Sequence, residues 1–173
     1  MVILVDENDF EIGKMPKMEA HEKACLHRAF SVFIFNSKGE LLLQKRADDK
    51  YHSGGLWANA CCSHPAPGQK TAEAARERLI MEMGIDIEST YVLTFTYKSP
   101  YENGLTEHEI DHVFISQTDD KPHINLEEVS EYKYISLDDL KKDIELHPES
   151  YTTWFRIISR DYLPQIANHI KTK

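Results

Sequence analysis

The sequence predicts an α+β protein in which a mixed β-sheet is flanked by a few helices. Segments rich in β-branched and aromatic residues lie on both sides of the turn-forming residues 36–39, which is typical of strands. Residues 71–83 carry apolar side chains at helical spacing and are followed by Gly84, a common residue at helix ends. Strands and helices do not follow one another in regular βαβ order, which argues against a doubly wound parallel sheet.

The N-terminal part should contain three strands. After a first strand over residues 2–5, polar and turn-like residues continue to Lys17. Residues 18–26 form a short helix or an ordered loop. Residues 27–35 and 40–46, joined by a tight turn, are expected to pair as a β-hairpin.

The clearest helix comes next, with Thr71 as its N-cap and Gly84 at its end. Its expected apolar stripe comprises Ala72, Ala75, Leu79 and Met83. The remaining elements are expected to be strands over residues 88–98, 107–116 and 132–135, and helices over residues 136–145 and 148–163.

Composition describes a globular protein of one domain, residues 1–173, in which residues 1–26 form a short extension that contributes to the site. Hydrophobic residues make up 41% and charged residues 28% of the chain, and no apolar run approaches the roughly 20 residues that span a bilayer. The net charge of −9 argues against a nucleic-acid partner. Three cysteines, two of them adjacent, do not make a disulfide framework, which favours a cytoplasmic location.

Residues 56–65 bring together a tryptophan, two cysteines and a histidine: Trp57, Cys61, Cys62 and His64. One interpretation is a buried strand that ends in a turn, with the cysteines as small core residues. The other is a reactive site, since a thiol, an imidazole and a large aromatic ring so close together are unusual in a chain with only three cysteines and two tryptophans.

A second group of residues could bind a metal ion. Glu107 and Glu109 are two apart in a strand-like segment, so their carboxylates point to the same face, which is either an exposed face or a cation site. His21, His27 and His64 could join them and complete a five- or six-coordinate site for a divalent transition metal. Five other histidines have no comparable grouping: His52, His108, His112, His123 and His147.

Four basic residues could bind an anion: Lys17, Arg46, Lys50 and Arg78. Arg46 offers a planar fork and Lys50 a point charge next to two glycines, which suits a diphosphate, although scattered surface cations would look the same. Glu82, one turn after Arg78, either pairs with that arginine or reaches a Mg²⁺ ion bound to the substrate.

These residues together resemble the type 1 isopentenyl diphosphate isomerase family over most of the chain, from Lys17 to Trp154. The resemblance is carried by residues 26–31 (LHRAFS), residues 57–65 (WANACCSHP), Tyr97, residues 107–109 (EHE) and Trp154. It implies a Nudix-like fold, with residues 71–84 as the Nudix helix.

The resemblance also implies residue roles. Cys62 and Glu109 would be the acid/base pair, with Tyr97 close to Glu109, and with Trp154 and Trp57 supplying π electrons. Lys17, Arg46, Lys50 and Arg78 would bind the diphosphate. One divalent ion (Mn²⁺ or Zn²⁺, or Mg²⁺) would be held by His21, His27, His64, Glu107 and Glu109. A Mg²⁺ ion shared with the diphosphate would be held by Glu82 and the Cys62 carbonyl. His21 and His27 are six residues apart, one closer than in some family members.

The implied reaction interconverts isopentenyl and dimethylallyl diphosphate through a tertiary carbocation, in a monomer or weak homodimer without nucleic-acid or membrane partners. A Nudix-type hydrolase is the first alternative, but its paired metal-binding acids are incomplete here: Met81 replaces one and only Glu82 remains. The second alternative is a non-enzymatic domain with a structural metal, although structural zinc sites favour cysteine-rich tetrahedra.

Overall fold

The computed structural model describes residues 1–50 and 52–170, so residue 51 and the last three residues of the predicted domain lie outside the described residues. The strands are β1 (Val2–Val5), β2 (Glu11–Met15), β3 (His27–Phe35), β4 (Leu41–Arg46), β5 (Trp57–Ala58), β6 (Cys61–Ser63), β7 (Thr90–Pro100), β8 (Thr106–Gln117) and β9 (Val129–Ile135). The helices are α1 (Lys17–Glu22), α2 (Thr71–Met83), α3 (Leu137–Leu146), α4 (Thr153–Asp161) and α5 (Leu163–Ala167), with a short 3₁₀ turn at Pro148–Ser150.

β3 lies at the centre of a mixed sheet. It pairs in parallel with β8 and antiparallel with β6, and it also contacts β1. β4 pairs with β3 only at Leu41 and Phe35, next to the turn, and then continues between β9 and β5. The predicted hairpin over residues 27–46 is therefore wrong beyond its turn, because β6 occupies the place beside β3.

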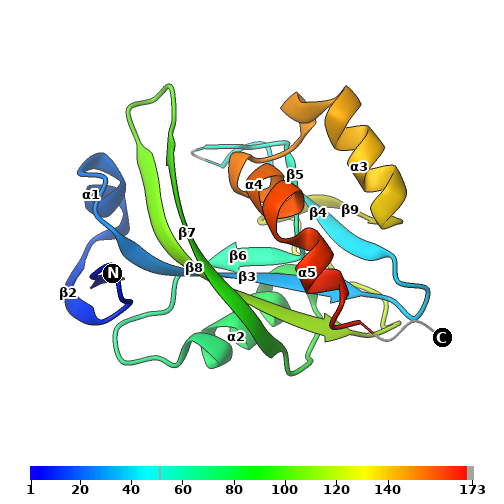
Figure 1. Cartoon of the computed structure of the whole chain (residues 1–173), viewed down its shortest axis with the longest axis horizontal. Helices are drawn as coiled ribbons and strands as arrows, with labels where there is room; N and C mark the ends of the chain where they lie inside the picture. The colour runs from blue at the N-terminus through cyan, green and yellow to red at the C-terminus, as the bar shows by residue number, and fades with distance from the viewer. Residues whose placement is uncertain (51, 171–173) are drawn as a thin grey trace.

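Helices cover both faces of this sheet, as Figure 1 shows: α2 lies below, and α3, α4 and α5 lie above. β3 serves both layers because successive side chains of a strand point to opposite faces. Phe33 and Phe35 join the core under α4 and α5, whereas Val32 and Ile34 join the core against α2. Burial on both faces explains why the strand has an almost continuous hydrophobic sequence.

α2 has the predicted bounds and ends at Gly84, whose φ of 64° is left-handed. The N-cap is Lys70, without a side-chain cap, and Thr71 is the first helical residue, so the predicted Thr71 cap is wrong. Ala72 is exposed and Ala74 is buried in its place, because the helix turns that position towards the sheet. The remainder of the predicted stripe is buried.

The C-terminal helix predicted over residues 148–163 is divided. Tyr151 is extended and pairs with Trp57, and only then does α4 begin at Thr153. The chain turns again at Tyr162, because Pro164 lacks the backbone N–H that a continuous helix would need there. The helix predicted over residues 136–145 is α3, and Ser136 is its N-cap, with its hydroxyl accepting from the Asp139 backbone N–H at 3.2 Å.

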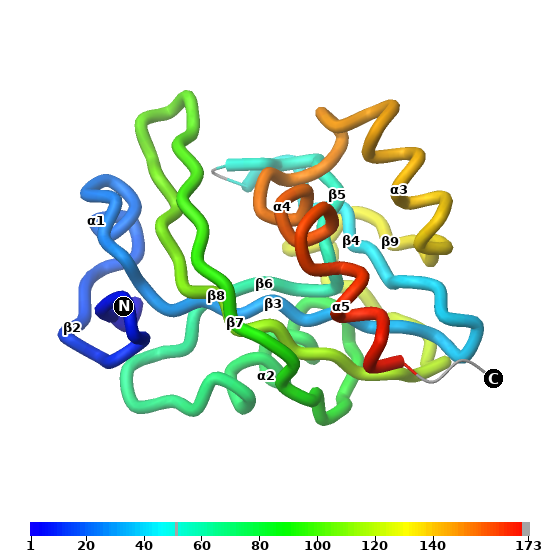
Figure 2. The backbone as a smooth tube through the Cα atoms, viewed as in Figure 1, coloured from blue at the N-terminus to red at the C-terminus, as the bar shows by residue number. Residues whose placement is uncertain are grey.

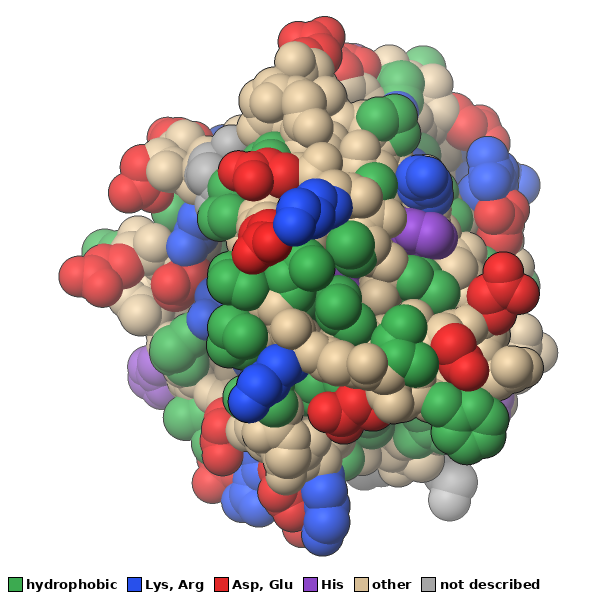
Figure 3. All heavy atoms as spheres, turned by 90° about the vertical axis from the view of Figure 1, so that its left-hand side faces the viewer, with side chains coloured by type: hydrophobic (Ala, Val, Ile, Leu, Met, Phe, Trp, Pro, Cys, Tyr) green, Lys and Arg blue, Asp and Glu red, His purple; other side chains and the backbone are tan. Residues whose placement is uncertain are grey.

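One strand, β2, was not predicted, because its residues Glu11–Met15 lack the alternation of a buried strand. It pairs with β1 at one end of the molecule, where the tube in Figure 2 brings α1 close to β8. Figure 3 shows hydrophobic side chains gathered on this end. Phe10 and Ile12 are 69% and 67% exposed.

No helix among residues 1–50 and 52–170 combines the length and the apolar character that crossing a membrane requires.

Candidate active site

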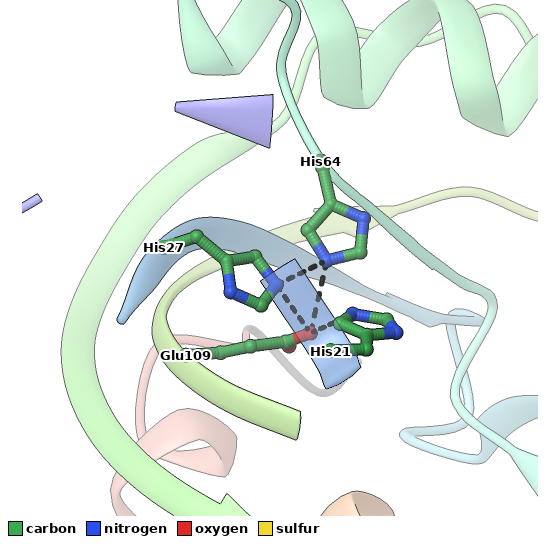
Figure 4. A group of neighbouring side chains, drawn as sticks. All are labelled: His21, His27, His64 and Glu109. Atoms are coloured by element: carbon green, nitrogen blue, oxygen red, sulfur yellow. Dashed lines mark hydrogen bonds and ion pairs between the residues drawn. The ribbon is translucent and has the colours of Figure 1, made fainter. Parts of the chain in front are cut away.

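Three imidazoles and one carboxylate converge at one end of the sheet, as Figure 4 shows: His21, His27, His64 and Glu109. The Nε2 atoms of the three histidines lie 3.8, 3.3 and 2.9 Å, in that order, from Oε1 of the glutamate. Donor atoms bound to one ion at about 2.0–2.2 Å must lie roughly 3–4 Å from each other. The four side chains can therefore hold one divalent metal ion.

Strand pairing explains why these residues meet. The parallel register of β3 and β8 places His27 opposite Glu109. β6 runs antiparallel on the other side of β3, with Ser63 opposite Phe30, and delivers His64 immediately after its end. His21 comes from α1, which packs beside β8. The shorter spacing between the first two histidines does not keep His21 out of the group.

Charge in this group suits a cation. Burial lowers the pKa of His21 and of His64 to about 4, so these imidazoles are neutral and keep a lone pair for a metal. Burial also opposes ionisation of Glu109, but the charge and hydrogen bonds of His64 and His27 outweigh it and hold the pKa of that carboxyl well below its usual value. Burial opposes protonation of His27, but the hydrogen bond to Glu109 and the charge of that carboxylate outweigh it and raise the pKa of His27. The site thus combines two neutral imidazoles, His21 and His64, with one carboxylate.

Glu107 lies beside this group and not within it. Its Oε2 accepts from the hydroxyls of Tyr101 at 2.6 Å and Tyr97 at 3.0 Å, and its Oε1 lies 3.4 Å from His52 Nε2. Burial, and then the negative charge of Glu109, raise the pKa of Glu107 to about 7. The Tyr97 hydroxyl is also 2.8 Å from Glu109 Oε2, so it links the two carboxylates.

Cys62 faces the same cavity, a narrow space of about 50 Å³. Its thiol donates to Asn59 Oδ1 at 3.1 Å and lies 3.4 Å from Ser31 Oγ. Burial raises the pKa of the thiol, so it carries its proton at neutral pH. Neighbouring Cys61 points the other way, into the core against α2, because adjacent strand residues face opposite sides.

The four predicted anion-binding residues are divided between two places. Lys17 and Arg46 line the cavity, and the buried Arg46 Nε makes no hydrogen bond to the described residues. Lys50 and Arg78 lie outside the lining and share one acceptor, Glu128 Oε2, at 2.5 and 2.8 Å.

Glu82 lies on the α2 side of the sheet and is also outside the cavity lining. Its carboxylate accepts from Gln44 Nε2 at 2.6 Å and pairs with Arg78, as one of the two interpretations of the i,i+4 spacing required. Met81, which replaces the second acid of the hydrolase pattern, is 43% exposed and cannot substitute for it.

The two tryptophans have different surroundings. Trp154 is 4% exposed, lines the cavity and has the Arg46 guanidinium 5.2 Å from its ring centroid. Trp57 sits in β5, where Lys133 Nζ lies 4.3 Å from its ring centroid, and it does not line the cavity.

Sequence reasoning missed several residues of the site. His52, which has no partner group in the sequence, stacks on Tyr101 with ring centroids 4.9 Å apart and makes a T-shaped contact with Trp154. Ser31 and Asp111 lie next to Cys62, and Glu128 binds two of the predicted anion-binding residues. The sequence holds a signal for one of these residues: Asp111 is two residues after Glu109 in the same strand, so their side chains lie on the same face.

Comparisons with known proteins agree with this geometry. The NUDIX domain model matches residues 26–155. The chain is 54% identical to isopentenyl-diphosphate Delta-isomerase of Pectobacterium atrosepticum, over 90% of this chain and 87% of the relative. It is 40% identical to the protein of the same name from Aliivibrio fischeri strain MJ11, over 95% and 96% of the two chains. In fold it is similar to the crystal structure of DR0079 from Deinococcus radiodurans, with a TM-score of 0.75, 18% identity, and coverage of 93% and 98%.

The match to the NUDIX model covers most of the chain, and the identity to the curated isomerases extends almost from end to end. The mixed sheet flanked by helices confirms the predicted fold class. The chain belongs to the isopentenyl-diphosphate Delta-isomerase family, within the NUDIX fold.

Proposed function

We propose that this chain interconverts isopentenyl diphosphate and dimethylallyl diphosphate in the cavity between Cys62 and Glu109. The supporting observation is that a protonated thiol and an ionised carboxylate, from different strands, line one narrow cavity. Moving a double bond by one position needs a proton added to one carbon and a proton removed from another. Two groups of opposite protonation state supply both functions.

The proton balance is closed. One group of the pair gives its proton to the terminal alkene carbon, which leaves a tertiary carbocation. The other group takes a proton from the neighbouring methylene, and the remaining electron pair forms the new double bond. Because the reaction is reversible, each group acts as acid in one direction and as base in the other. No electron is gained or lost, so no redox cofactor takes part.

The donor set favours a divalent ion next to the base. His21, His27, His64 and Glu109 would hold it, and the ion would offset the negative charge of Glu109 and fix the orientation of its carboxylate. Imidazole and carboxylate ligands suit Mn²⁺ and Zn²⁺, and which of them binds stays a prediction. Glu107, which the family resemblance adds as a fifth ligand, also stays a prediction.

A small-molecule diphosphate is the substrate class. Arg46 supports its binding here, because the guanidinium reaches the cavity with a buried Nε–H that has no acceptor among the described residues. Lys17 lines the same cavity. Lys50 and Arg78 would form a second row of positive charge, held by Glu128. A Mg²⁺ ion bound by Glu82 and the Cys62 carbonyl stays a prediction.

Trp154 would stabilise the carbocation. Its ring lines the cavity, and a cation over an indole face gains about 0.5–2 kcal/mol. The structure gives Trp57 no such position, so we assign the π contribution to Trp154 alone. A carbocation also requires the exclusion of water, which the burial of Tyr97, Trp154 and Glu109 favours.

Proton NMR in deuterated water tests this proposal. Purified protein is incubated with isopentenyl diphosphate, Mg²⁺ and Mn²⁺, and we expect dimethylallyl diphosphate that carries deuterium from the solvent. A chelated sample is the control. Unchanged substrate in a folded, metal-loaded sample would contradict the proposal, and release of inorganic phosphate or pyrophosphate would favour the hydrolase alternative. A cytoplasmic location and a monomeric or weakly dimeric state stay predictions.

A further inference from the structure

We propose that Ser31 positions the sulfur of Cys62 for proton transfer, and that Asp111 holds Ser31 in place. This inference rests on the proposed role of Cys62. Ser31 Oγ lies 3.4 Å from Cys62 Sγ and donates to Asp111 Oδ2 at 2.7 Å. The three side chains come from β3, β6 and β8 and lie in one row of polar contacts across the central strand.

Asp111 is the feature that the core alone does not explain. Asp111 is 2% exposed, and its Oδ1 makes no hydrogen bond to the described residues. A buried carboxyl with a half-used set of hydrogen bonds destabilises a fold, so its presence points to a role other than packing. The Asp111 carboxyl accepts a hydrogen bond from the Ser31 hydroxyl, through Oδ2.

The other partner of the sulfur can only accept a hydrogen bond from it. Asn59 Nδ2 donates to the backbone oxygens of Val32 and Cys61, at 3.1 and 2.9 Å, which fixes the orientation of the amide. Asn59 Oδ1 therefore faces Cys62 and accepts from the thiol. Once the thiol has given up its proton, Asn59 Oδ1 can no longer form a hydrogen bond with the sulfur, because both atoms are then acceptors.

Ser31 can serve the sulfur in both of its protonation states, because a hydroxyl both donates and accepts. With Cys62 protonated, Ser31 donates to Asp111, as in the structure. With Cys62 deprotonated during the reaction, the hydroxyl can turn its proton towards the sulfur without a movement of either Cα atom, and its hydrogen bond to Asp111 is then broken. Before this exchange, Asp111 keeps the Ser31 side chain in the rotamer from which its proton can reach the sulfur.

Kinetics of Ser31→Ala test the first half of the inference. Loss of one hydrogen bond to a reacting sulfur should lower kcat about tenfold, with KM for isopentenyl diphosphate unchanged. Ser116→Ala is the matched control, because Ser116 is a buried serine of β8 with two hydrogen bonds of its own. It should lose stability without losing kcat. Equal losses of kcat in the two folded variants would overturn the proposal.

A double-mutant cycle tests the second half. If Asp111 acts only through Ser31, then Asp111→Ala lowers kcat, and adding it to Ser31→Ala lowers kcat no further. Asp111→Asn keeps an acceptor oxygen and should lose less activity than Asp111→Ala. Additive losses, or a rise in KM in the Asp111 variants, would mean that Asp111 contacts the substrate directly, and would overturn the assigned role.

A spectroscopic measurement reports on the position of the thiol. The Raman S–H stretching band of Cys62, identified by difference against Cys62→Ala, should shift in Ser31→Ala, because loss of the 3.4 Å contact frees the sulfur to move relative to Asn59 Oδ1, the acceptor of its proton. The band should stay in place in Ser116→Ala. The Cys62→Ala variant also distinguishes failure of the positioning role of Ser31 from failure of the proposed role of Cys62. If it retains activity, the proposed role of Cys62 fails. If it is inactive while Ser31→Ala keeps both its kcat and its S–H band, only the positioning role fails.

Discussion

Glu109 presents Oε1 to three imidazole nitrogens and Oε2 to the Tyr97 hydroxyl. Both a metal and a proton would therefore meet at one carboxylate. Glu109→Gln keeps the shape but removes the charge, and we expect kcat to fall at least 100-fold, within the usual effect of losing a general acid or base. The measurement is the deuterium-incorporation assay together with metal content. Exposed Glu145→Gln is the control, and activity near wild type in folded Glu109→Gln would refute the role.

The two tryptophans offer a second comparison between single residues. Trp154→Phe should lower kcat several-fold, because phenylalanine is a weaker partner for a cation than tryptophan. Trp57→Phe should have the smaller effect on kcat, because its ring faces Lys133 and not the cavity. Steady-state kinetics at saturating substrate gives kcat of the two variants for this comparison. A larger loss of kcat in Trp57→Phe would contradict the placement of the carbocation against Trp154.

At the scale of elements, Glu128 joins the segment after β4 to α2 and to the start of β9, through Lys50 and Arg78. Burial opposes its ionisation, but the hydrogen bond from Lys50 and the charge of Arg78 outweigh it, so the pKa of Glu128 is lower than normal. The ionised form is therefore favoured by folding. Its stabilisation is present above the unfolded pKa near 4.5 and is lost as pH falls through the lower, folded value.

Chemical unfolding of Glu128→Gln as a function of pH checks this. At pH 7 the variant should be less stable than wild type by roughly 1 kcal/mol, the scale of a partly exposed ion pair. The difference should shrink as pH falls below about 4.5. A difference that stays constant down to pH 3 would show that the carboxylate charge is not the cause.

The end of α2 allows a similar test of backbone conformation. Gly84 has a φ of 64°, and a Cβ added there would lie 2.6 Å from the backbone oxygen of His123. Gly104 also has a positive φ, of 83°, but a Cβ there would meet nothing within 4 Å. Gly104→Ala should cost about 1 kcal/mol of stability, and Gly84→Ala clearly more, because strain and a steric clash add. An equal loss of stability in the two variants, measured by thermal unfolding, would contradict the close approach of His123 to Gly84.

For the whole molecule, a metal that binds only the folded chain must stabilise it. Mn²⁺ or Zn²⁺ at about 100 times its dissociation constant should add about 2.7 kcal/mol and raise Tm. His21→Ala should lose most of this rise, whereas His147→Ala, at an exposed position outside the group, should keep it. Calorimetry with and without metal makes the comparison, and an equal rise in both variants would exclude His21 as a ligand.

Local sequence predicted what local forces decide. β3 has its expected bounds because five of its nine residues are phenylalanine, valine or isoleucine, and α2 ends at the glycine that can adopt a left-handed turn. The pairing partner of β3 could not be predicted this way, since β6 and β8 reach it only through long-range contacts. His21 and Glu109 could be named through family resemblance. The contacts of His52 with the site and of Glu128 with Lys50 depend on the conformation of the segment after β4, which the local sequence does not determine.

The site also draws on almost the full length of the chain, from His21 in α1 to Trp154 in α4. A nascent chain leaving the ribosome would therefore acquire this chemistry late. Its metal-binding group stays incomplete until Glu109 has emerged, and the cavity wall stays open until α4 packs onto the sheet. Because such distant contacts form slowly, the cysteine pair and the central strand would be exposed for much of synthesis. Cellular folding of this enzyme would thus be most vulnerable to oxidation and aggregation before its last helices are made.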